Sequence, residues 1–377
     1  MKGILKMSET LRGDLSVISL TGGENFAEQV DSYLRQWRGG DESFIIKPQW
    51  PRFGSGEGKC VLHDSLRGHD VYVIADVFNY GVRYKMYGES VPMSPDDHYQ
   101  DLKRLICAIE GKANRLSVIM PMLYEGRQHK RSMRESLDCA SALQELIQLG
   151  VSNIITFDAH DPRVQNAIPN HGFDNVHPTY QMIKNLVRVY PDISLNKENL
   201  MLVSPDEGAM SRSMYYSSVL GIDLGMFYKR RNYSVIVDGR NPIEAHEYLG
   251  RDVKGKDIIV VDDMISSGDS MFEVAKHLKE MGANRIFIFA TFGLFCNGLD
   301  KFDEMYEKKV FDKIFTTNLI YGSPALKERE WYHSVNMCKY VSLLIDTLNH
   351  DKSISPLLKP IDRINKLLST LPPERRN

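Results

Sequence analysis

The stretch from Asp257 to Ser270, DIIVVDDMISSGDS, limits the possible folds of this chain most strongly. Its apolar run, Ile258–Val261, has the composition of a strand buried on both faces, and Asp262 and Asp263 end that strand. A loop of Ser and Gly residues follows. Apolar residues then recur at helical spacing before Gly282: Met271, Val274, Ala275, Leu278 and Met281. This order of a strand, an acidic pair, a small-residue loop and an amphipathic helix favours a phosphate site over a polar turn without a ligand.

A loop of this kind binds an anion through its backbone. Small residues let N–H groups close around the anion, and the N-terminus of the following helix adds positive potential. A phosphate on the loop would leave Asp262 and Asp263 facing the group that carries it, and carboxylates suit either a sugar diol or a magnesium ion. The acidic pair and loop also resemble the phosphoribosyl-diphosphate motif of the type I phosphoribosyltransferase superfamily. That resemblance alone leaves open whether the chain makes the diphosphate or consumes it.

The composition of the chain is that of a globular protein. With 377 residues, 42% hydrophobic and 25% charged, the chain is long enough for two domains with sizeable cores. A formal net charge of −2 predicts no general attraction to nucleic acid or to membranes. No apolar run is long enough to span a bilayer, and the N-terminal apolar stretch is too short for a secretory signal. Five scattered cysteines lack zinc-binding or redox spacing, so we expect reduced thiols and a cytoplasmic protein.

Short apolar runs alternate with helical patterns along most of the chain. Such alternation predicts parallel sheets covered by helices, with ligands beyond the carboxyl ends of the strands. Helices are expected at 97–109, 133–149 and 180–189. Buried strands are expected at 71–75, 117–120, 153–157, 199–203, 258–261 and 285–290.

Two segments concentrate positive charge beyond predicted strand ends. The first, Glu125–Arg131, contains Arg127, and guanidinium groups bind phosphate oxygens in a fork. The second has consecutive cations at Lys229–Arg231, before a polar, loop-like stretch at 232–251. The first pattern is equally compatible with a phosphate-binding loop and with a solvated basic loop. The second is equally compatible with a mobile cationic flap over phosphates and with a basic hairpin tip.

Two further polar segments follow predicted strands. His160 lies between Asp158 and Asp161, and a His in that setting can ligate a metal or hold a phosphate oxygen, although a lone His is more often structural. Asp206 lies in a turn of small residues and repeats the pattern of a backbone anion cradle beside an acid.

Taken together, these motifs resemble the ribose-phosphate diphosphokinase family, also called the phosphoribosyl-diphosphate synthetases. They occur in the family's order and at compatible distances over roughly residues 15–345. The resemblance implies an α/β fold of two tandem type I phosphoribosyltransferase-like domains, each a mostly parallel sheet flanked by helices. An ATP-side domain is expected at 13–174, a domain with the ribose 5-phosphate loop and a catalytic flexible loop at 175–350, and a tail at 351–377.

The reaction that the resemblance implies is transfer of the β,γ-diphosphoryl group of ATP to the 1-hydroxyl of ribose 5-phosphate, with Mg²⁺. The implied ribose 5-phosphate contacts are Asp262, Asp263, Ser266, Ser267, Gly268, Asp269 and Ser270. The implied ATP contacts are Phe53, Glu57, Arg127, Gln128 and His160. His160 and Asp206 would lie at the metal, and Lys229 and Arg231 match the cations of the catalytic loop. A homo-oligomer based on dimers, up to a hexamer, is also expected.

Two other interpretations stay open. A phosphoribosyltransferase would use the same loop but bind a base, which leaves Arg127, the loop cations and a second α/β domain less well explained. A catalytically silent homologue that regulates a true synthetase by co-assembly tends to lose the loop cations, and both Lys229 and Arg231 are present here. Departures from the family pattern include Ser266 at the start of the phosphate loop and a long segment at 80–97. These departures affect the expected adenine contacts, allosteric regulation and assembly more than the expected reaction.

Overall fold

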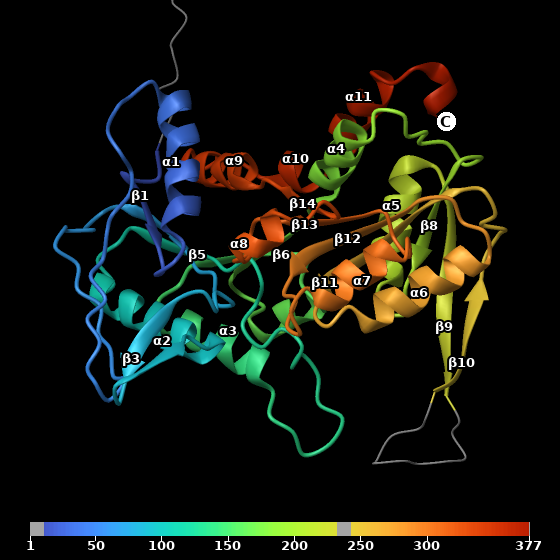
Figure 1. The fold of residues 1–377 in the computed structure, drawn as a ribbon. Helices are drawn as coiled ribbons and strands as arrows, with labels where there is room; N and C mark the ends of the chain where they lie inside the picture. Colours follow the sequence, from blue (N-terminus) through green and yellow to red (C-terminus); the bar gives the residue numbers. More distant parts are fainter. Residues whose placement is uncertain (1–10, 232–242, 377) are drawn as a thin grey trace, which may run out of the picture. The chain divides into compact units, whose positions relative to one another are not determined.

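The computed structural model describes residues 11–231 and 243–376, which form two compact units (Figure 1). Unit 1 contains residues 11–177 together with two later segments, Leu319–Tyr321 and Asn336–Lys359. Unit 2 contains Pro178–Asn318, Gly322–Val335 and the residues from Pro360 onward. The segment 336–350, expected in the second domain, therefore belongs with unit 1, because the helix that it forms packs on the first helix of the chain.

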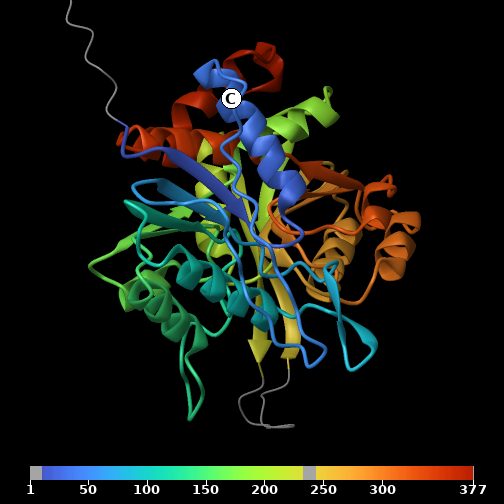
Figure 2. The same cartoon turned by 90° about the vertical axis from the view of Figure 1, so that its left-hand side faces the viewer.

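Unit 1 is built on a sheet of parallel strands in the order β1-β2-β5-β6-β7. Its strands are β1 (Leu15–Ser19), β2 (Asp70–Ile74), β5 (Arg115–Ile119), β6 (Asn153–Phe157) and β7 (Gly172–Val176). Its helices include α1 (Glu24–Arg38), α2 (Pro95–Ile109), α3 (Asp138–Gln148), α9 (Cys338–Asn349) and α10 (Ser355–Leu358), with a 3₁₀ turn at Pro162–Ala167. Figures 1 and 2 show α2 and α3 on one face of this sheet and α1 and α9 on the other. The predicted parallel sheet covered by helices is thus present.

The start of α2 illustrates how local sequence sets an element. Ser94 caps the helix, since its hydroxyl accepts from the Asp97 N–H while the Asp97 side chain accepts from the Ser94 N–H, and Pro95 occupies the first turn. The polar segment before it forms a hairpin of β3 (Arg83–Met86) and β4 (Glu89–Pro92). The expected helix 133–149 is shorter than predicted, because residues before Asp138 do not adopt helical hydrogen bonding.

Unit 2 is built on a larger sheet in the order β10-β9-β8-β11-β12-β13-β14. All neighbouring strands are parallel except β10, which runs antiparallel to β9. Its strands are β8 (Leu200–Ser204), β9 (Asp223–Arg231), β10 (Ile243–Leu249), β11 (Asp257–Ile265), β12 (Ile286–Gly293), β13 (Lys313–Thr317) and β14 (Tyr332–Val335). Its helices include α4 (Thr179–Val189), α5 (Met210–Leu220), α6 (Asp269–Glu280), α7 (Asp300–Glu307), α8 (Pro324–Lys327) and α11 (Ile361–Ser369), with a 3₁₀ turn at Pro373–Arg375.

The apolar strands of unit 2 are buried on both faces. Along β12, Ile286 and Ile288 join the core beneath α6 and α7, whereas Phe287 and Phe289 point to the other side. There the ring of Phe287 lies 4.7 Å from that of Tyr190. The continuous apolar run predicted as a buried strand is explained by this two-sided packing.

One sequence-based expectation about unit 2 is wrong. The stretch 232–251 was expected to be loop-like, but Ile243–Leu249 forms strand β10, paired with β9 as far as Ile243 opposite Arg231. Its sequence, IEAHEYL, mixes polar and apolar residues and lacks the continuous apolar run of a buried strand. Residues 232–242 lie outside the described part of the chain.

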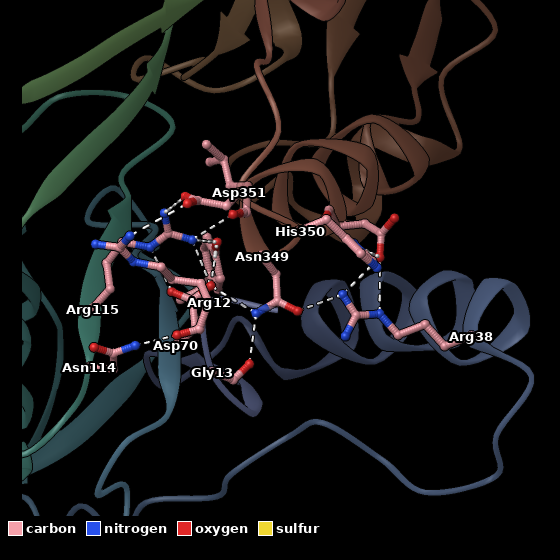
Figure 3. Close-up of polar contacts among 12 residues, drawn as sticks. Arg12, Gly13, Arg38, Asp70, Asn114, Arg115, Asn349, His350 and Asp351 are labelled. Atoms are coloured by element: carbon pink, nitrogen blue, oxygen red, sulfur yellow. Dashed lines mark hydrogen bonds and ion pairs between the residues drawn. The ribbon is translucent and has the colours of Figure 1, made fainter. Parts of the chain in front are cut away.

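A buried polar network fastens α9 to the sheet of unit 1 (Figure 3). Asp70, the first residue of β2, is fully buried, and Arg115 donates two hydrogen bonds to its carboxylate at 2.8 and 2.7 Å. The Asn349 amide, at the end of α9, donates to the same carboxylate at 2.9 Å, and the Tyr72 hydroxyl donates to it at 3.0 Å. Arg38 of α1 donates to the Asn349 oxygen at 2.8 Å. The network thereby ties two strands and two helices together through one carboxylate.

Removing the cation of this network should destabilise unit 1. We expect Arg115→Met to lower the free energy of unfolding by about 3–5 kcal/mol, because it leaves a buried carboxylate without its counter-charge. Lys112→Met, which breaks only the exposed pair between Lys112 and Glu110, is the control and should stay close to wild type. Urea denaturation measures both, and equal midpoints for the two variants would contradict a stabilising role for the network.

Candidate functional site

The loop after β11 forms the N-terminus of α6. β11 ends at Ile265 and α6 begins at Asp269, which leaves Ser266, Ser267 and Gly268 as the connection. Gly268 is the N-cap residue and has a φ of +86°, in the left-handed region that favours glycine. Small residues ahead of a helix of 12 residues give the arrangement of backbone N–H groups that binds anions.

Gly268 is also required by its neighbours. A Cβ at this position would lie 2.5 Å from Cζ of Phe302 and 3.0 Å from Cε2 of Phe272. Phe302 is buried, and its ring centroid lies 4.8 Å from that of Phe272, 4.9 Å from Phe295 and 5.5 Å from Trp331. Because this aromatic cluster is densely packed, the Phe302 ring has no space into which to retreat. The loop therefore rests on a rigid support.

The acidic pair lies within β11 and is followed by Met264 and Ile265, so it does not end the strand as the sequence predicted. Asp263 is buried and Asp262 is partly exposed. Burial, and then the charge of Asp263, raise the pKa of Asp262 well above its usual range, while Arg212 opposes this shift from 3.7 Å. A bound cation would favour the ionised form of both carboxylates. The pair is thus suited to hold a metal ion or to accept hydrogen bonds from hydroxyl groups.

The turn that contains Asp206 lies on the neighbouring strand. The Ser204 hydroxyl donates to the Asp206 carbonyl at 2.7 Å, and the Ala209 N–H donates to the Asp206 carboxylate at 3.1 Å. β8 pairs in parallel with β11, so this turn and Asp262 lie at the same edge of the sheet. Arg212, in the first turn of α5, is absent from the predicted site, and only its place soon after the Asp206 turn could have indicated it.

In unit 1, three of the five predicted ATP contacts follow two adjacent strand ends. Arg127 and Gln128 are exposed and lie after β5, where the Gln128 N–H donates to the Glu125 carbonyl at 2.8 Å. His160 is exposed and lies after β6, the strand next to β5. His129, which the sequence-based site did not include, connects these two loops, because its ring centroid lies 5.3 Å from that of His160.

His129 is held in its place by a carboxylate. Its Nε2 lies 3.5 Å from Oδ2 of Asp161, whose pKa is lowered to about 2 chiefly by hydrogen bonds from Arg163. Burial lowers the pKa of His129, so the ring is predominantly neutral at pH 7. A neutral imidazole at this strand end can accept a hydrogen bond or ligate a metal ion.

Phe53 and Glu57 form a separate turn in unit 1. The Phe53 N–H donates to the Glu57 carbonyl at 2.8 Å, and the Ser55 hydroxyl donates to the Glu57 carboxylate at 2.8 Å. Phe53 is 57% exposed, which is unusual for a large apolar side chain and leaves its ring free to stack on a ligand. Tyr87, at the tip of the β3–β4 hairpin, donates its N–H to the Gly54 carbonyl at 2.8 Å. The long segment at 80–97 therefore supports this turn.

The structure describes only the backbone of the two predicted loop cations. Lys229 and Arg231 lie at the end of β9, where Lys229 pairs with His246 and Arg231 with Ile243 of β10. Their side chains lie outside the described part of the structure.

The described residues lack both a metal-binding cluster and a membrane-spanning helix. Within residues 11–231 and 243–376, no three His, Cys, Asp or Glu side chains gather as a metal cluster. Mg²⁺ needs no such cluster, because one or two carboxylates together with substrate phosphates commonly hold it, and Asp262 and Asp263 offer suitable oxygens. None of the helices in those same ranges is both long and apolar enough to cross a bilayer.

Comparison with known proteins assigns the two halves of the chain to domain types. Residues 15–150 match the N-terminal domain of ribose phosphate pyrophosphokinase, and residues 173–329 match the phosphoribosyl transferase domain. The fold resembles the crystal structure of phosphoribosylpyrophosphate synthetase from Mycobacterium smegmatis, with a TM-score of 0.72, 20% sequence identity, and coverage of 90% of this chain and 99% of that one. The chain thus has two phosphoribosyltransferase-type domains, as the sequence predicted.

Curated relatives define the family more narrowly. Ribose-phosphate pyrophosphokinase from Ureaplasma parvum is 31% identical over 82% of this chain and 85% of that protein. The enzyme of the same name from Vibrio parahaemolyticus is 26% identical over 81% and 89%, respectively. The chain belongs to the ribose-phosphate pyrophosphokinase family.

The support of the loop by Phe302 can be tested through stability. We expect Gly268→Ala to lower the free energy of unfolding by about 2–4 kcal/mol, because both a positive φ and a steric clash oppose the added methyl group. Gly255→Ala is the control, since Gly255 has a φ of +74° but open space around its Cβ position, and should cost only about 1 kcal/mol. Urea denaturation measures the free energy of unfolding of both variants. Equal losses of stability would mean that the Phe302 ring moves aside for the methyl group.

Proposed function

We propose that this chain is a ribose-phosphate pyrophosphokinase, which transfers the β,γ-diphosphoryl group of ATP to the 1-hydroxyl of ribose 5-phosphate and releases AMP. One observation carries the proposal: a loop suited to a sugar phosphate in unit 2 occurs in the same chain as a complete second α/β unit with its own cationic loop. Relatives named for this activity support it over 82% of the chain. A phosphoribosyltransferase that consumes the diphosphate would leave the second unit without a role.

Ribose 5-phosphate is proposed to bind at the edge of the unit 2 sheet. The hydroxyl groups of Ser266, Ser267 and Ser270 and the backbone N–H groups of the loop would hold the 5-phosphate, with Gly268 giving the backbone its turn. The carboxylates of Asp262 and Asp263 would face the ribose hydroxyls, directly or through a metal ion. This arrangement would leave the 1-hydroxyl free to approach a second substrate.

ATP is proposed to bind to unit 1. Arg127 and Gln128 would contact its phosphates, His160 would lie at the metal and polyphosphate, and Phe53 and Glu57 would contact adenine. The exposed Phe53 ring and the fixed Glu57 carboxylate support the last assignment, since a ring can stack on a base and a carboxylate can accept from an amino group.

The reaction is an in-line displacement at phosphorus. A bond forms between the 1-oxygen of ribose and the β-phosphorus, the bond from that phosphorus to the α-phosphate oxygen breaks, and the hydroxyl proton is lost. Such a transfer needs two aligned substrates and neutralisation of the phosphate oxygens rather than covalent help. Mg²⁺ would supply part of this charge. Asp206 and the acidic pair are its proposed ligands in unit 2, and His160 is its proposed ligand in unit 1. Lys229 and Arg231 would supply the rest.

A cytoplasmic homo-oligomer based on dimers, up to a hexamer, is part of the same proposal. Phe53 and Tyr87 on unit 1 are exposed, and exposed large apolar side chains often contact a ligand or another subunit, which supports this proposal. Sedimentation velocity on the purified chain tests the assembly, and a monomer at all concentrations would contradict it.

A short assay separates the proposal from its rivals. The purified chain is incubated with ATP, ribose 5-phosphate and Mg²⁺, and AMP is measured. AMP formation that depends on the sugar phosphate supports a pyrophosphokinase. No AMP under any divalent metal would favour the silent regulatory homologue, and release of diphosphate from phosphoribosyl diphosphate on addition of a base would favour a phosphoribosyltransferase.

Arg212 should set the acid limit of activity. The high pKa of Asp262 means that its carboxylate protonates as pH falls, and loss of Arg212 raises that pKa further. We therefore expect Arg212→Met to move the acid limb of kcat/KM for ribose 5-phosphate to higher pH by roughly one to three units, the usual effect of one close opposite charge. Arg251→Met, which breaks an exposed pair with Asp223, is the control. An unchanged acid limb in Arg212→Met would show that Asp262 does not need its charge.

The loop cations should act mainly in the transition state. We expect Lys229→Ala and Arg231→Ala each to lower kcat by roughly two to four powers of ten with much smaller changes in KM. Arg230→Ala should be mild, because alternate residues of the extended strand β9 face opposite sides. Steady-state kinetics on the three variants measures this. A crippled Arg230→Ala would mean that the register is wrong, and three normal variants would exclude a catalytic role for the segment.

A further inference from the structure

The phosphate loop of unit 2 carries an unfavourable charge. Asp269 is the first residue of α6 and follows Gly268 directly, so its carboxylate lies at the helix N-terminus where the phosphate is proposed to bind. A phosphate dianion at this position would meet the Asp269 carboxylate, which competes for the positive end of the helix dipole.

One cation lies beside Asp269. Lys301, in the first turn of α7, forms an ion pair with the Asp269 carboxylate, and its Nζ lies 5.8 Å from the ring centroid of Phe272. Phe272 belongs to α6 and borders Gly268, so the ammonium group is held between an acid and an aromatic face next to the loop. The pair with Lys301 lowers the pKa of Asp269, which keeps this carboxylate ionised.

The same turn of α7 also supports the loop mechanically. Phe302, the residue after Lys301, is the side chain that a Cβ on Gly268 would strike. Helix α7 therefore contacts the loop at two successive residues, one through packing and one through charge. The Lys301 side chain is 54% exposed, so the two N–H bonds that Asp269 does not use can face a ligand.

We propose that Lys301 is a positioning residue for the sugar phosphate, which neutralises Asp269 and thereby allows a phosphate dianion to bind at the loop. The inference rests on the proposed function, because that function places the 5-phosphate on the loop. It adds a residue outside the loop motif, and it explains how a phosphate site tolerates an acid at its helix N-terminus.

The experiment compares Lys301→Met, Asp269→Asn and the double variant with Lys308→Met. Lys308 is the matched control, since it lies on the same helix and forms an exposed ion pair with Glu304. Binding of ribose 5-phosphate and of inorganic phosphate is measured by calorimetry without ATP, and KM and kcat are measured for both substrates. Thermal unfolding of each variant checks that the fold is intact.

We expect Lys301→Met to weaken ribose 5-phosphate binding roughly five- to twentyfold, the effect of one partly screened charge near an anion, with KM for ATP unchanged. In the Asp269→Asn background the loss of Lys301 should change affinity by less than about threefold, because the carboxylate that Lys301 neutralises is then absent. Lys308→Met should match wild type.

Three results would overturn the inference. Lys301→Met could bind as wild type does, the double variant could be as weak as Lys301→Met, or both substrates could be affected equally. The second result would mean that the lysine acts on the ligand without regard to Asp269. If the wild-type protein binds no ribose 5-phosphate, the proposed function is wrong and the inference about Lys301 is wrong with it. If the wild-type protein binds ribose 5-phosphate and one of the three results above is found, only the inference about Lys301 is wrong.

Discussion

Charge balance at the carboxyl edge of the unit 2 sheet is the constraint on which the rest of that unit depends. Asp262 and Asp263 lie within β11, and desolvating two adjacent carboxylates is unfavourable without counter-charge. Arg212 from α5 offsets part of that cost. The negative charge that Arg212 leaves uncompensated favours the binding of a cation or of hydroxyl groups that donate hydrogen bonds.

In unit 1, a buried charge fixes the position of a helix. Helix α9 packs against unit 1, although it follows most of unit 2 in the sequence. Hydrophobic packing of α9 on α1 does not by itself specify where the helix ends. The Asp70 carboxylate does so, because only one position of Asn349 satisfies that carboxylate, the Gly13 carbonyl and Arg38 together. The network lies at the amino ends of β2 and β5, away from the loops that carry Arg127 and His160.

Much of this architecture could be predicted from the sequence, because each strand of the parallel sheets is a continuous apolar run and each helix has an amphipathic period. The α/β fold and the family are confirmed. The site residues stay predictions. The structure places Asp262 on β11 and Asp206 after the adjacent strand β8, and it places Arg127 and His160 after the adjacent strands β5 and β6.

Three features of the structure could not be predicted from the sequence, each for a physical reason. Strand β10 could not be predicted because its mixed polar and apolar sequence lacks the continuous apolar run of a buried strand. The membership of α9 in unit 1 depends on long-range pairing with Asp70. The supporting roles of Phe302 and Lys301 arise from an approach between α7 and α6 that no local pattern encodes.

The order of strands in unit 2 explains why the proposed catalytic groups can act together. β9, β8 and β11 are consecutive neighbours and all run parallel, with Met226 opposite Ser204 and Val203 opposite Val260. Residues shortly beyond those positions are therefore at one edge of the sheet. For β8 this is Asp206, and for β11 it is the acidic pair. Lys229 and Arg231 lie further along β9, three and five residues beyond Met226. The proposed metal ligand and the proposed sugar contacts thus come to one edge of the sheet from segments far apart in sequence. An antiparallel β8 would separate them by the length of a strand, which is why the parallel topology is a condition for this chemistry.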